Sequence, residues 1–318
     1  MGIKHMNRYL IDRCSKNSIC KFHLRFAEGK TVVVDTSIYM YKYMTQKALI
    51  EYMYLMISIL LEYKIVPVFI FDGKAPLEKK ELLRERSRHK KEAENKYNLI
   101  HKEMEKNDIN NDVRKDLMDE LESLKKKFIR IKESDITQIK CLMDAYGISY
   151  LTADGEADKL CALMVKTGKA WACLSDDMDM FVYGCPRVLR HMSLLKHTII
   201  FYDFENILKE LGILETSFRE IMVLSGTDYN IHQNISLNDA FKWFYEYYTI
   251  NQNKDLPVTF YEWLFKNKKC HFNFDELMKI YGMFHINENN YVTYPITHKT
   301  PNYLELKKLL KNDGFITL

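Results

Sequence analysis

Three short apolar runs in this chain lead into acidic residues, and this pattern limits the folds that the chain can adopt. TVVVD covers residues 31–35, VPVFIFDG covers residues 66–73, and KAWACLSDDMD covers residues 169–179. Each run has the length and apolar content of a buried strand. A long segment with helical spacing separates the first two runs. We therefore predict β-α-β units, in which parallel strands bring their carboxyl ends to one edge of a sheet.

The chain resumes this alternation after one long interruption. Residues 133–228 alternate between strand and helix patterns, and residues 229–318 are mostly helical in pattern. We predict an α/β fold, with a twisted and mostly parallel sheet flanked by helices and an inserted helical arch. The predicted domains are an N-terminal segment (1–77), the arch (78–132), an internal segment that completes the sheet (133–228) and a helical C-terminal region (229–318).

The interruption, residues 78–132, is highly charged and lacks Gly and Pro. Its composition favours helices, and we expect its apolar residues to be too sparse for a core of its own. It is either a solvated hairpin with ordinary ion pairs or an arch that faces a polyanion. Lys79 and Arg86 lie seven residues apart, so on one helix they would share a face. They are either a surface pair or two cations that stabilise charge on a phosphate.

Composition excludes several classes of protein. The chain has 318 residues, of which 47% are hydrophobic and 28% are charged, which excludes a disordered chain. Its seven cysteines form no C-x-x-C pair, which favours reduced thiols in an intracellular protein. We expect a soluble protein, because no apolar run reaches membrane-spanning length and no secretory signal is found. The net charge of +4 does not by itself indicate a nucleic-acid partner.

Acidic residues recur at the ends of the predicted strands and helices. Each one alone has a simple explanation, because an acid caps a helix, makes a turn or faces water. Seven acids at one sheet edge would repel one another unless they were protonated or bound cations. Carboxylates without His or Cys suit Mg²⁺ or Mn²⁺, and seven exceed what one Mg²⁺ uses, so we expect two ions. The seven acids are Asp35, Asp72, Glu156, Asp158, Asp177, Asp179 and Asp228.

Seven stretches of the chain resemble the flap endonuclease branch of the XPG-type 5′ nucleases, in order and in spacing. They are MGIK, VVVDTSIYMY, VFIFDGKAP, RERS, YGISYLTADGEAD, SDDMDMFVYG and SGTDY, within roughly residues 1–230. The resemblance implies a PIN-like nuclease core and a helical arch through which a 5′ single strand passes. It also implies two Mg²⁺ ions, for which Mn²⁺ can substitute.

The resemblance also assigns roles to individual residues. Asp35, Asp72, Glu156 and Asp158 match the acids of the first metal, and Asp177, Asp179 and Asp228 match those of the second. Lys79 and Arg86 match the phosphate-contacting pair at the base of the arch and are the predicted catalytic cations. Tyr41 matches an aromatic residue on which a base stacks, although a packed helix tyrosine is an alternative. The predicted DNA contacts are Tyr41, Gly2, Lys90, Lys91 and Arg130.

Two features of the family are missing from this chain. In the family, a helix–two-turn–helix hairpin with a Gly-Ile-Gly turn and basic residues grips duplex phosphate with backbone amides and a bound K⁺. Here Asn238 and Asp239 stand in place of the glycines and the basic pair. We therefore expect that binding of duplex DNA by this segment is altered or lost. We find no sliding-clamp peptide, because QKALIEYM (46–53) is better interpreted as core packing.

The resemblance implies metal-dependent cleavage of 5′ flaps or branched DNA. A junction resolvase or a 5′ exonuclease with the same site is an alternative, as is a non-catalytic DNA-binding scaffold. Flapped or branched DNA is the expected partner, and replication or recombination proteins are further candidates. We expect no membrane partner.

Overall fold

The computed structural model describes residues 3, 5–106, 111–231, 233, 235–251, 258–267, 273–287, 296 and 298–312. It divides into two compact units. The first unit comprises Met1–Ile38, Leu55–Ala75 and Gly147–Lys299, and the second comprises Tyr39–Tyr54, Pro76–Tyr146 and Thr300–Leu318. In the part of the chain that is described, no helix has the length and apolarity needed to cross a membrane.

The described residues of the first unit contain a seven-stranded sheet in the order β1-β7-β6-β5-β2-β3-β4. Strands β6, β5, β2, β3 and β4 run parallel, whereas β7 pairs antiparallel with β6 and β1. The predicted mostly parallel sheet flanked by helices is confirmed. The strands are β1 (Ile19–His23), β2 (Thr31–Asp35), β3 (Val66–Phe71), β4 (Tyr150–Thr152), β5 (Ala172–Leu174), β6 (Arg187–Ser193) and β7 (Thr198–Asp203).

Both faces of this sheet are buried at its centre, as a parallel sheet requires. On β2, Val33 packs in the main core, and its neighbours Val32 and Val34 are buried on the opposite face. The continuous apolar sequence of the strand follows from this double burial. The helical elements of this unit are α1 (Met6–Arg13), η1 (Leu24–Ala27), α7 (Ala157–Lys166), α8 (Asp179–Val182), α9 (Phe204–Leu211), α10 (Glu215–Ser225), α11 (Leu237–Asn251), α12 (Phe260–Lys266) and α13 (Phe274–Met283).

The helical pattern between β2 and β3 forms two helices, α2 (Thr36–Thr45) and α3 (Leu49–Glu62), where the sequence suggests one long segment. The amide of Lys47 donates to the carbonyl of Met44, a tighter i→i+3 bond, and Lys47 has a left-handed φ of 59°. A left-handed residue ends an α-helix because the next amides turn away from its axis.

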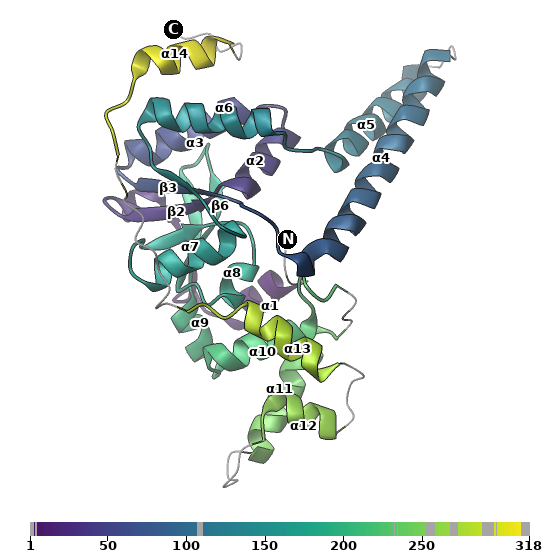
Figure 1. Ribbon diagram of the computed structural model, residues 1–318, viewed down its shortest axis with the longest axis vertical. Helices are drawn as coiled ribbons and strands as arrows, with labels where there is room; N and C mark the ends of the chain where they lie inside the picture. Colours follow the sequence, from purple (N-terminus) through teal and green to yellow (C-terminus); the bar gives the residue numbers. More distant parts are fainter. Residues whose placement is uncertain are drawn as a thin grey trace. The chain divides into compact units, whose positions relative to one another are not determined.

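The second unit contains a helical hairpin of α4 (Lys80–Lys106) and α5 (Asn111–Lys127), which lie side by side in Figure 1. Ala93, Ile100 and Leu124 are buried between these helices, and Tyr97 and Phe128 pack against them. The expectation that this segment has too few apolar residues for a core was therefore wrong. The apolar residues are few, but their spacing of three and four places them on one face.

The remaining elements of the second unit are η2 (Leu77–Lys79), α6 (Glu133–Tyr146) and α14 (Tyr303–Asn312). The amide of Asn302 donates to the carbonyl of Ala145 at 2.7 Å, which joins the start of α14 to the end of α6. Leu306 and Leu310 of α14 are buried. The predicted domain boundaries stay predictions.

Candidate active site

The edge formed by the carboxyl ends of β5, β2 and β3 gathers four of the seven predicted acids. These strands are neighbours and run parallel, so their carboxyl ends share one edge of the sheet. Asp35 is the last residue of β2, and Asp72 directly follows β3. Asp177 and Asp179 follow β5 after a short turn. The topology therefore brings together acids that are up to 144 residues apart in the sequence.

Asp35, at the end of β2, is almost fully buried, with 3% of its surface exposed. Burial and the nearby carboxylates of Asp72 and Asp177 raise the pKa of Asp35 to about 7. The hydroxyl of Ser175 opposes this shift by donating to Oδ2 of Asp35 at 2.9 Å, as does the amide of Ile38. Three carboxylates at this edge thus interact electrostatically, and neutral Asp35 or a bound cation would relieve their repulsion.

The segment after β5 is a compact turn whose acids point inward. Its amides form a chain of hydrogen bonds, in which the amide of Asp177 donates to Oγ of Ser175 and the amide of Asp179 donates to Oδ1 of Asp177, both at 3.1 Å. Asp177 is 7% exposed and Asp179 is 2% exposed. The alternative of an acidic loop that points into water is therefore wrong for these two residues.

Asp176, between these acids, has a different role. Its Oδ1 accepts a hydrogen bond from the amide of His191 at 2.7 Å, and its carbonyl accepts one from Nη2 of Arg190 at 2.8 Å. Asp176 thus attaches the turn to β6. Its side chain bonds to another strand, whereas the side chain of Asp177 accepts a hydrogen bond from within the turn.

Helix α7 contributes Glu156 and Asp158 from its amino-terminal end. Glu156 occupies the N-cap position and Asp158 the first turn, so Glu156 precedes the first full turn as their convergence requires. The N-cap side chain does not cap this helix. Instead, Oδ1 of Asp72 accepts the hydrogen bond from the amide of Ala157 at 2.8 Å. Asp72 therefore links the end of β3 to the start of α7.

Gly73 makes this link sterically possible. Its amide donates to the carbonyl of Gly155 at 2.7 Å, which draws the two backbone segments together. A Cβ atom at position 73 would lie 1.9 Å from the carbonyl oxygen of Ala153. Any side chain here would push the end of β3 away from α7, and with it Asp72.

Asp228 follows α10 in a turn that Asn230 stabilises. Oδ1 of Asn230 accepts hydrogen bonds from the amide and the hydroxyl of Thr227, at 2.7 and 2.6 Å. Nδ2 of Asn230 donates to the carbonyl of Val223 at 2.8 Å. Gly226 starts the turn with a φ of 99°, which a side chain would strain. The half-buried Asp228 thus occupies a fixed position after the helix.

Two tyrosines that the sequence gave no reason to select lie among these acids. The hydroxyl of Tyr229 donates a short hydrogen bond to Oε2 of Glu156, and it lies 3.2 Å from the hydroxyl of Tyr183. Burial and the charges of Glu156 and Asp179 raise the pKa of Tyr229. Burial, Tyr229 and the charges of Asp158 and Glu156 raise that of Tyr183. Both tyrosines stay protonated, and Tyr229 fixes the orientation of the Glu156 carboxylate.

The donor chemistry of this edge fits a hard divalent cation, because every candidate ligand is a carboxylate oxygen. Across the described ranges, no group of three or more His, Cys, Asp or Glu side chains is arranged so that it holds a metal ion. Asp72 and Asp177 are close enough to Asp35 to raise its pKa, and Glu156 and Asp179 are both close enough to Tyr229 to raise the pKa of its hydroxyl. Assignment of the seven acids to two metals stays a prediction.

The two predicted catalytic cations belong to the second unit. Lys79 ends η2 and is 8% exposed, whereas Arg86 lies in the second turn of α4, which starts at Lys80. The seven-residue spacing suggested that Lys79 and Arg86 share one regular helix. The structure instead places Lys79 in η2 and Arg86 in α4. Pro76, at the N-cap of η2 with a φ of −65°, directs the chain into this tighter first turn.

Two of the predicted DNA contacts of the second unit, Tyr41 and Lys90, are in contact with each other. The ammonium of Lys90 lies 5.1 Å from the centroid of the Tyr41 ring, and Tyr41 is 39% exposed. Burial and the charges of Arg130 and Arg86 lower the pKa of Lys90, so these cations are close to one another. Lys91 is exposed, and Gly2 lies outside the described residues.

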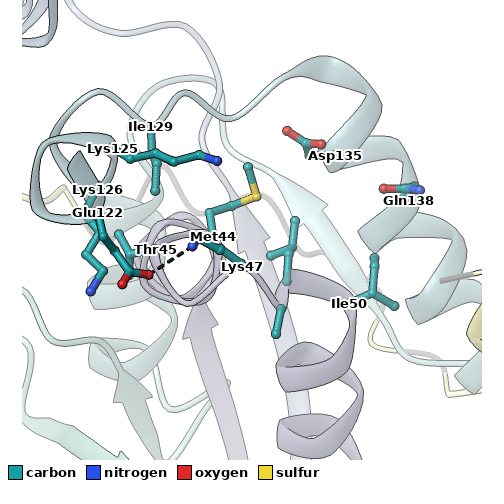
Figure 2. Close-up of a pocket in the computed structure, with 12 residues that line it drawn as sticks. Met44, Thr45, Lys47, Ile50, Glu122, Lys125, Lys126, Ile129, Asp135 and Gln138 are labelled. Carbon is teal, nitrogen blue, oxygen red and sulfur yellow. Dashed lines mark hydrogen bonds and ion pairs between the residues drawn. The ribbon is translucent and has the colours of Figure 1, made fainter. Parts of the chain in front are cut away.

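A cavity of about 360 Å³ in the second unit was not anticipated from the sequence (Figure 2). Met44 and Ile129 supply apolar surface, and Lys125, Asp135 and Gln138 supply polar groups. An ion pair of 2.9 Å between Lys47 and Glu122 spans its side. Three separate segments of the chain form this cavity, so no single sequence motif predicts it.

Comparisons with known proteins match two regions of this chain to one family. The XPG N-terminal domain matches residues 1–93, and the XPG I-region matches residues 147–228. Flap endonuclease 1-B of Xenopus laevis is 28% identical over 248 residues, which cover 72% of this chain and 61% of that protein. The chain thus matches about three fifths of the length of this relative.

Two solved structures share the fold. The catalytic core of Rad2 in complex with a DNA substrate has a TM-score of 0.70 at 21% identity, covering 98% of this chain and 96% of that one. Human GEN1 in complex with Holliday junction DNA has a TM-score of 0.65 at 17% identity, covering 98% and 74%. The two matched XPG regions include all seven acids of the candidate site. The chain therefore carries the N-terminal domain and the I-region of the XPG family, and it is similar to flap endonucleases.

Proposed function

We propose that this chain is a metal-dependent, structure-specific DNA endonuclease that hydrolyses phosphodiesters at 5′ flaps or branches. The observation that carries the proposal is the set of carboxylates at one sheet edge, where burial and two neighbouring acids raise the pKa of Asp35 to about 7. Such an arrangement is unfavourable unless a cation or a proton offsets it. The matched family regions and the flap endonuclease relatives support DNA as the substrate.

We propose that Asp35, Asp72, Glu156 and Asp158 hold one Mg²⁺ and that Asp177, Asp179 and Asp228 hold a second, with Mn²⁺ as a substitute. Bound at this edge, two such ions would activate water and stabilise the leaving oxygen of a phosphodiester. Cleavage in this manner leaves 5′-phosphate and 3′-hydroxyl ends.

The chain's own residues have separate tasks in this proposal. Tyr229 orients the Glu156 carboxylate through its hydrogen bond, and Asp72 fixes the start of α7. Lys79 and Arg86 neutralise charge on the scissile phosphate. Tyr41, Lys90, Lys91, Arg130 and Gly2 contact the DNA strand near the cut, with Tyr41 stacking on a base.

A second candidate is a junction resolvase or 5′ exonuclease with the same site. The segment between α10 and α11 favours it, because Asp239 in the first turn of α11 bonds to Ser236 at 2.5 Å and places negative charge there. An acid at that helix end stabilises the helix but repels phosphate, so duplex binding differs from that of the family's basic hairpin. The GEN1 likeness is compatible with this candidate.

We infer a viral setting from two features of the sequence. The composition is rich in Ile, Asn and Tyr, and the chain is compact, as in the poxvirus flap-endonuclease-like protein that it resembles. The proposed roles are viral DNA replication, recombination or repair in the host cytoplasm, where replication or recombination proteins are candidate partners.

A panel of labelled DNAs tests the proposal. It contains a 5′ flap, a nicked duplex, a four-way junction and a single strand, incubated with Mg²⁺ or with EDTA. Metal-dependent cleavage at the base of the flap is the expected result. Cleavage of the junction alone, or only from a free 5′ end, would support the second candidate. Binding without cleavage of any DNA would favour a non-catalytic scaffold.

A further inference from the structure

Four aromatic rings of the first unit form a continuous series, which we call the aromatic strip. The Trp171 and Phe201 rings are stacked, with centroids 5.7 Å apart and an interplanar angle of 3°. Phe201 contacts Phe22 at 5.7 Å, and Phe22 contacts Phe26 at 6.2 Å. Phe201 lies on β7 and Phe22 on β1, so the strip reaches the outer strand of the sheet.

The aromatic strip lies apart from the main core and from the acidic edge. On β7, Ile200 and Tyr202 pack with the main core, so Phe201 between them projects from the other face. Trp171 precedes the first residue of β5, whereas Asp177 and Asp179 follow the last one. The aromatic strip therefore begins at the amino end of β5, whereas Asp177 and Asp179 follow the carboxyl end of the same strand.

One end of the aromatic strip is open to solvent. Phe26 is 70% exposed, and Phe22, Trp171 and Phe201 are half-buried. A single exposed Phe needs no explanation, but a run of partly exposed rings in mutual contact indicates a binding surface. Ring faces of this kind stack on nucleobases without regard to sequence, because every base has a π-face.

The charge of the surrounding chain favours a polyanion. The segments that supply the four rings, residues 19–27, 168–174 and 194–202, contain no Asp or Glu. They contain four basic residues, all of which are exposed in the structure. The four are Lys21, Arg25, Lys169 and Lys196. The Nε of Arg187 also donates to the carbonyl of Trp171 at 2.5 Å, which adds a fifth cation beside the rings.

We propose that the aromatic strip binds single-stranded nucleic acid by stacking bases on Phe26 and Phe22, with the nearby lysines and Arg25 contacting phosphates. The inference rests on the proposed function, which makes DNA the partner, and adds a second contact surface for it away from the acidic edge. A purely apolar protein partner would gain nothing from segments that carry only positive charge. Because the strip has rings and cations but no base-edge readout, we expect little sequence preference.

Binding of a dye-labelled oligothymidine to the full chain, measured by fluorescence anisotropy in EDTA, tests the inference. Phe26→Ala should weaken binding about five-fold or more, because one lost stacking contact has an effect of that order. Phe265→Ala is the matched control, since Phe265 is an exposed phenylalanine of the same unit, on α12, with 62% exposure. It should change the affinity by less than about two-fold.

A pair of charge reversals tests the electrostatic part. Lys196→Glu should weaken oligothymidine binding and reduce its salt dependence, because a phosphate contact is lost. Lys266→Glu makes the same change in net charge on α12 and should have the smaller effect. Each variant should have the same melting temperature as the parent, because the four substituted side chains are exposed. They are Phe26, Lys196, Phe265 and Lys266.

Equal affinities for Phe26→Ala and Phe265→Ala would overturn the inference and leave the strip to another occupant, such as a protein. Cleavage with Mg²⁺ separates this result from the proposed function. Flap cleavage without Phe26-dependent binding would overturn the strip alone. Phe26-dependent binding without cleavage of any DNA would contradict the proposed nuclease and support the strip.

Discussion

The acidic edge of the sheet and the α4–α5 hairpin are stabilised in opposite ways. At the edge, buried carboxylates interact unfavourably, and the fold holds them with strand pairing, the Ser175 hydrogen bond and the Asp72 cap on α7. In the hairpin, Ala93, Ile100 and Leu124 form an apolar seam between the two helices, and exposed ion pairs such as Lys96–Glu120 accompany it. The fold thus tolerates mutual repulsion of buried carboxylates at the edge, and a functional role is the expected reason for it.

This comparison predicts that edge acids matter for activity more than for stability. Asp179→Asn should lower single-turnover cleavage of a flap by about 100-fold or more, because the loss of a metal ligand removes several kcal/mol of transition-state stabilisation. The melting temperature should stay the same or rise, since one repelling charge is gone. Asp176→Asn is the matched control in the same turn, because an amide oxygen still accepts from the amide of His191. Similar cleavage rates for Asp179→Asn and Asp176→Asn would contradict the assignment of a metal-binding role to Asp179 and a structural role to Asp176.

The raised pKa of Asp35 predicts a pH dependence of metal-free protein. Folded Asp35 titrates at about 7, against 3.8 for the unfolded chain, so between these values the folded state holds a proton that the unfolded state has lost. The free energy of unfolding should therefore fall as the pH rises from about 4 to 7, by an amount on the order of 1–3 kcal/mol.

Chemical unfolding in EDTA at a series of pH values measures this dependence. Burial also raises the pKa of Glu220 to about 7, with the same sign, so the comparison with Asp35→Asn isolates Asp35. The Asn variant should have a flatter profile, and Mg²⁺ should stabilise the parent at neutral pH. An Asn profile as steep as that of the parent would show that Asp35 is already charged.

The stability of the α4–α5 hairpin should depend on the apolar residues buried between its two helices. Leu124→Ala removes a side chain that is 5% exposed and should destabilise α4 and α5 by about 2 kcal/mol, the lower end for a buried Leu. Hydrogen exchange should accelerate in these two helices and not in the sheet. Leu99→Ala, in the same hairpin but on α4 and 63% exposed, should change little. Faster exchange throughout the chain would mean that the hairpin is part of one cooperative core.

The smallest effect is expected for the ion pairs of the hairpin. Lys96 and Glu120 lie 2.7 Å apart, but their side chains are 60% and 41% exposed, so water and salt screen them. A double-mutant cycle with Ala at both positions should give a coupling of about 0.5 kcal/mol or less. A coupling above about 1 kcal/mol would show that charges as well as the seam hold the hairpin together.

The sequence predicted the parts of this molecule that local chemistry determines. The runs ending at Asp35 and Asp72 formed adjacent parallel strands, because apolar strands separated by helical segments leave few other topologies. Strand β1 was missed because Lys21 and His23 interrupt its apolar pattern and its stability comes from pairing with β7. The role of Tyr229 was missed because its partner, Glu156, is 73 residues away and only the tertiary fold joins them.

Binding of Mn²⁺ to the metal-free chain, followed by the loss of the free-ion signal in electron paramagnetic resonance, tests the central claim most directly. The account predicts two bound ions per chain, and fewer for Asp179→Asn than for Asp176→Asn. Binding that is absent, or that is equal in the two variants, would contradict the claim that the acids of this sheet edge exist to hold metal.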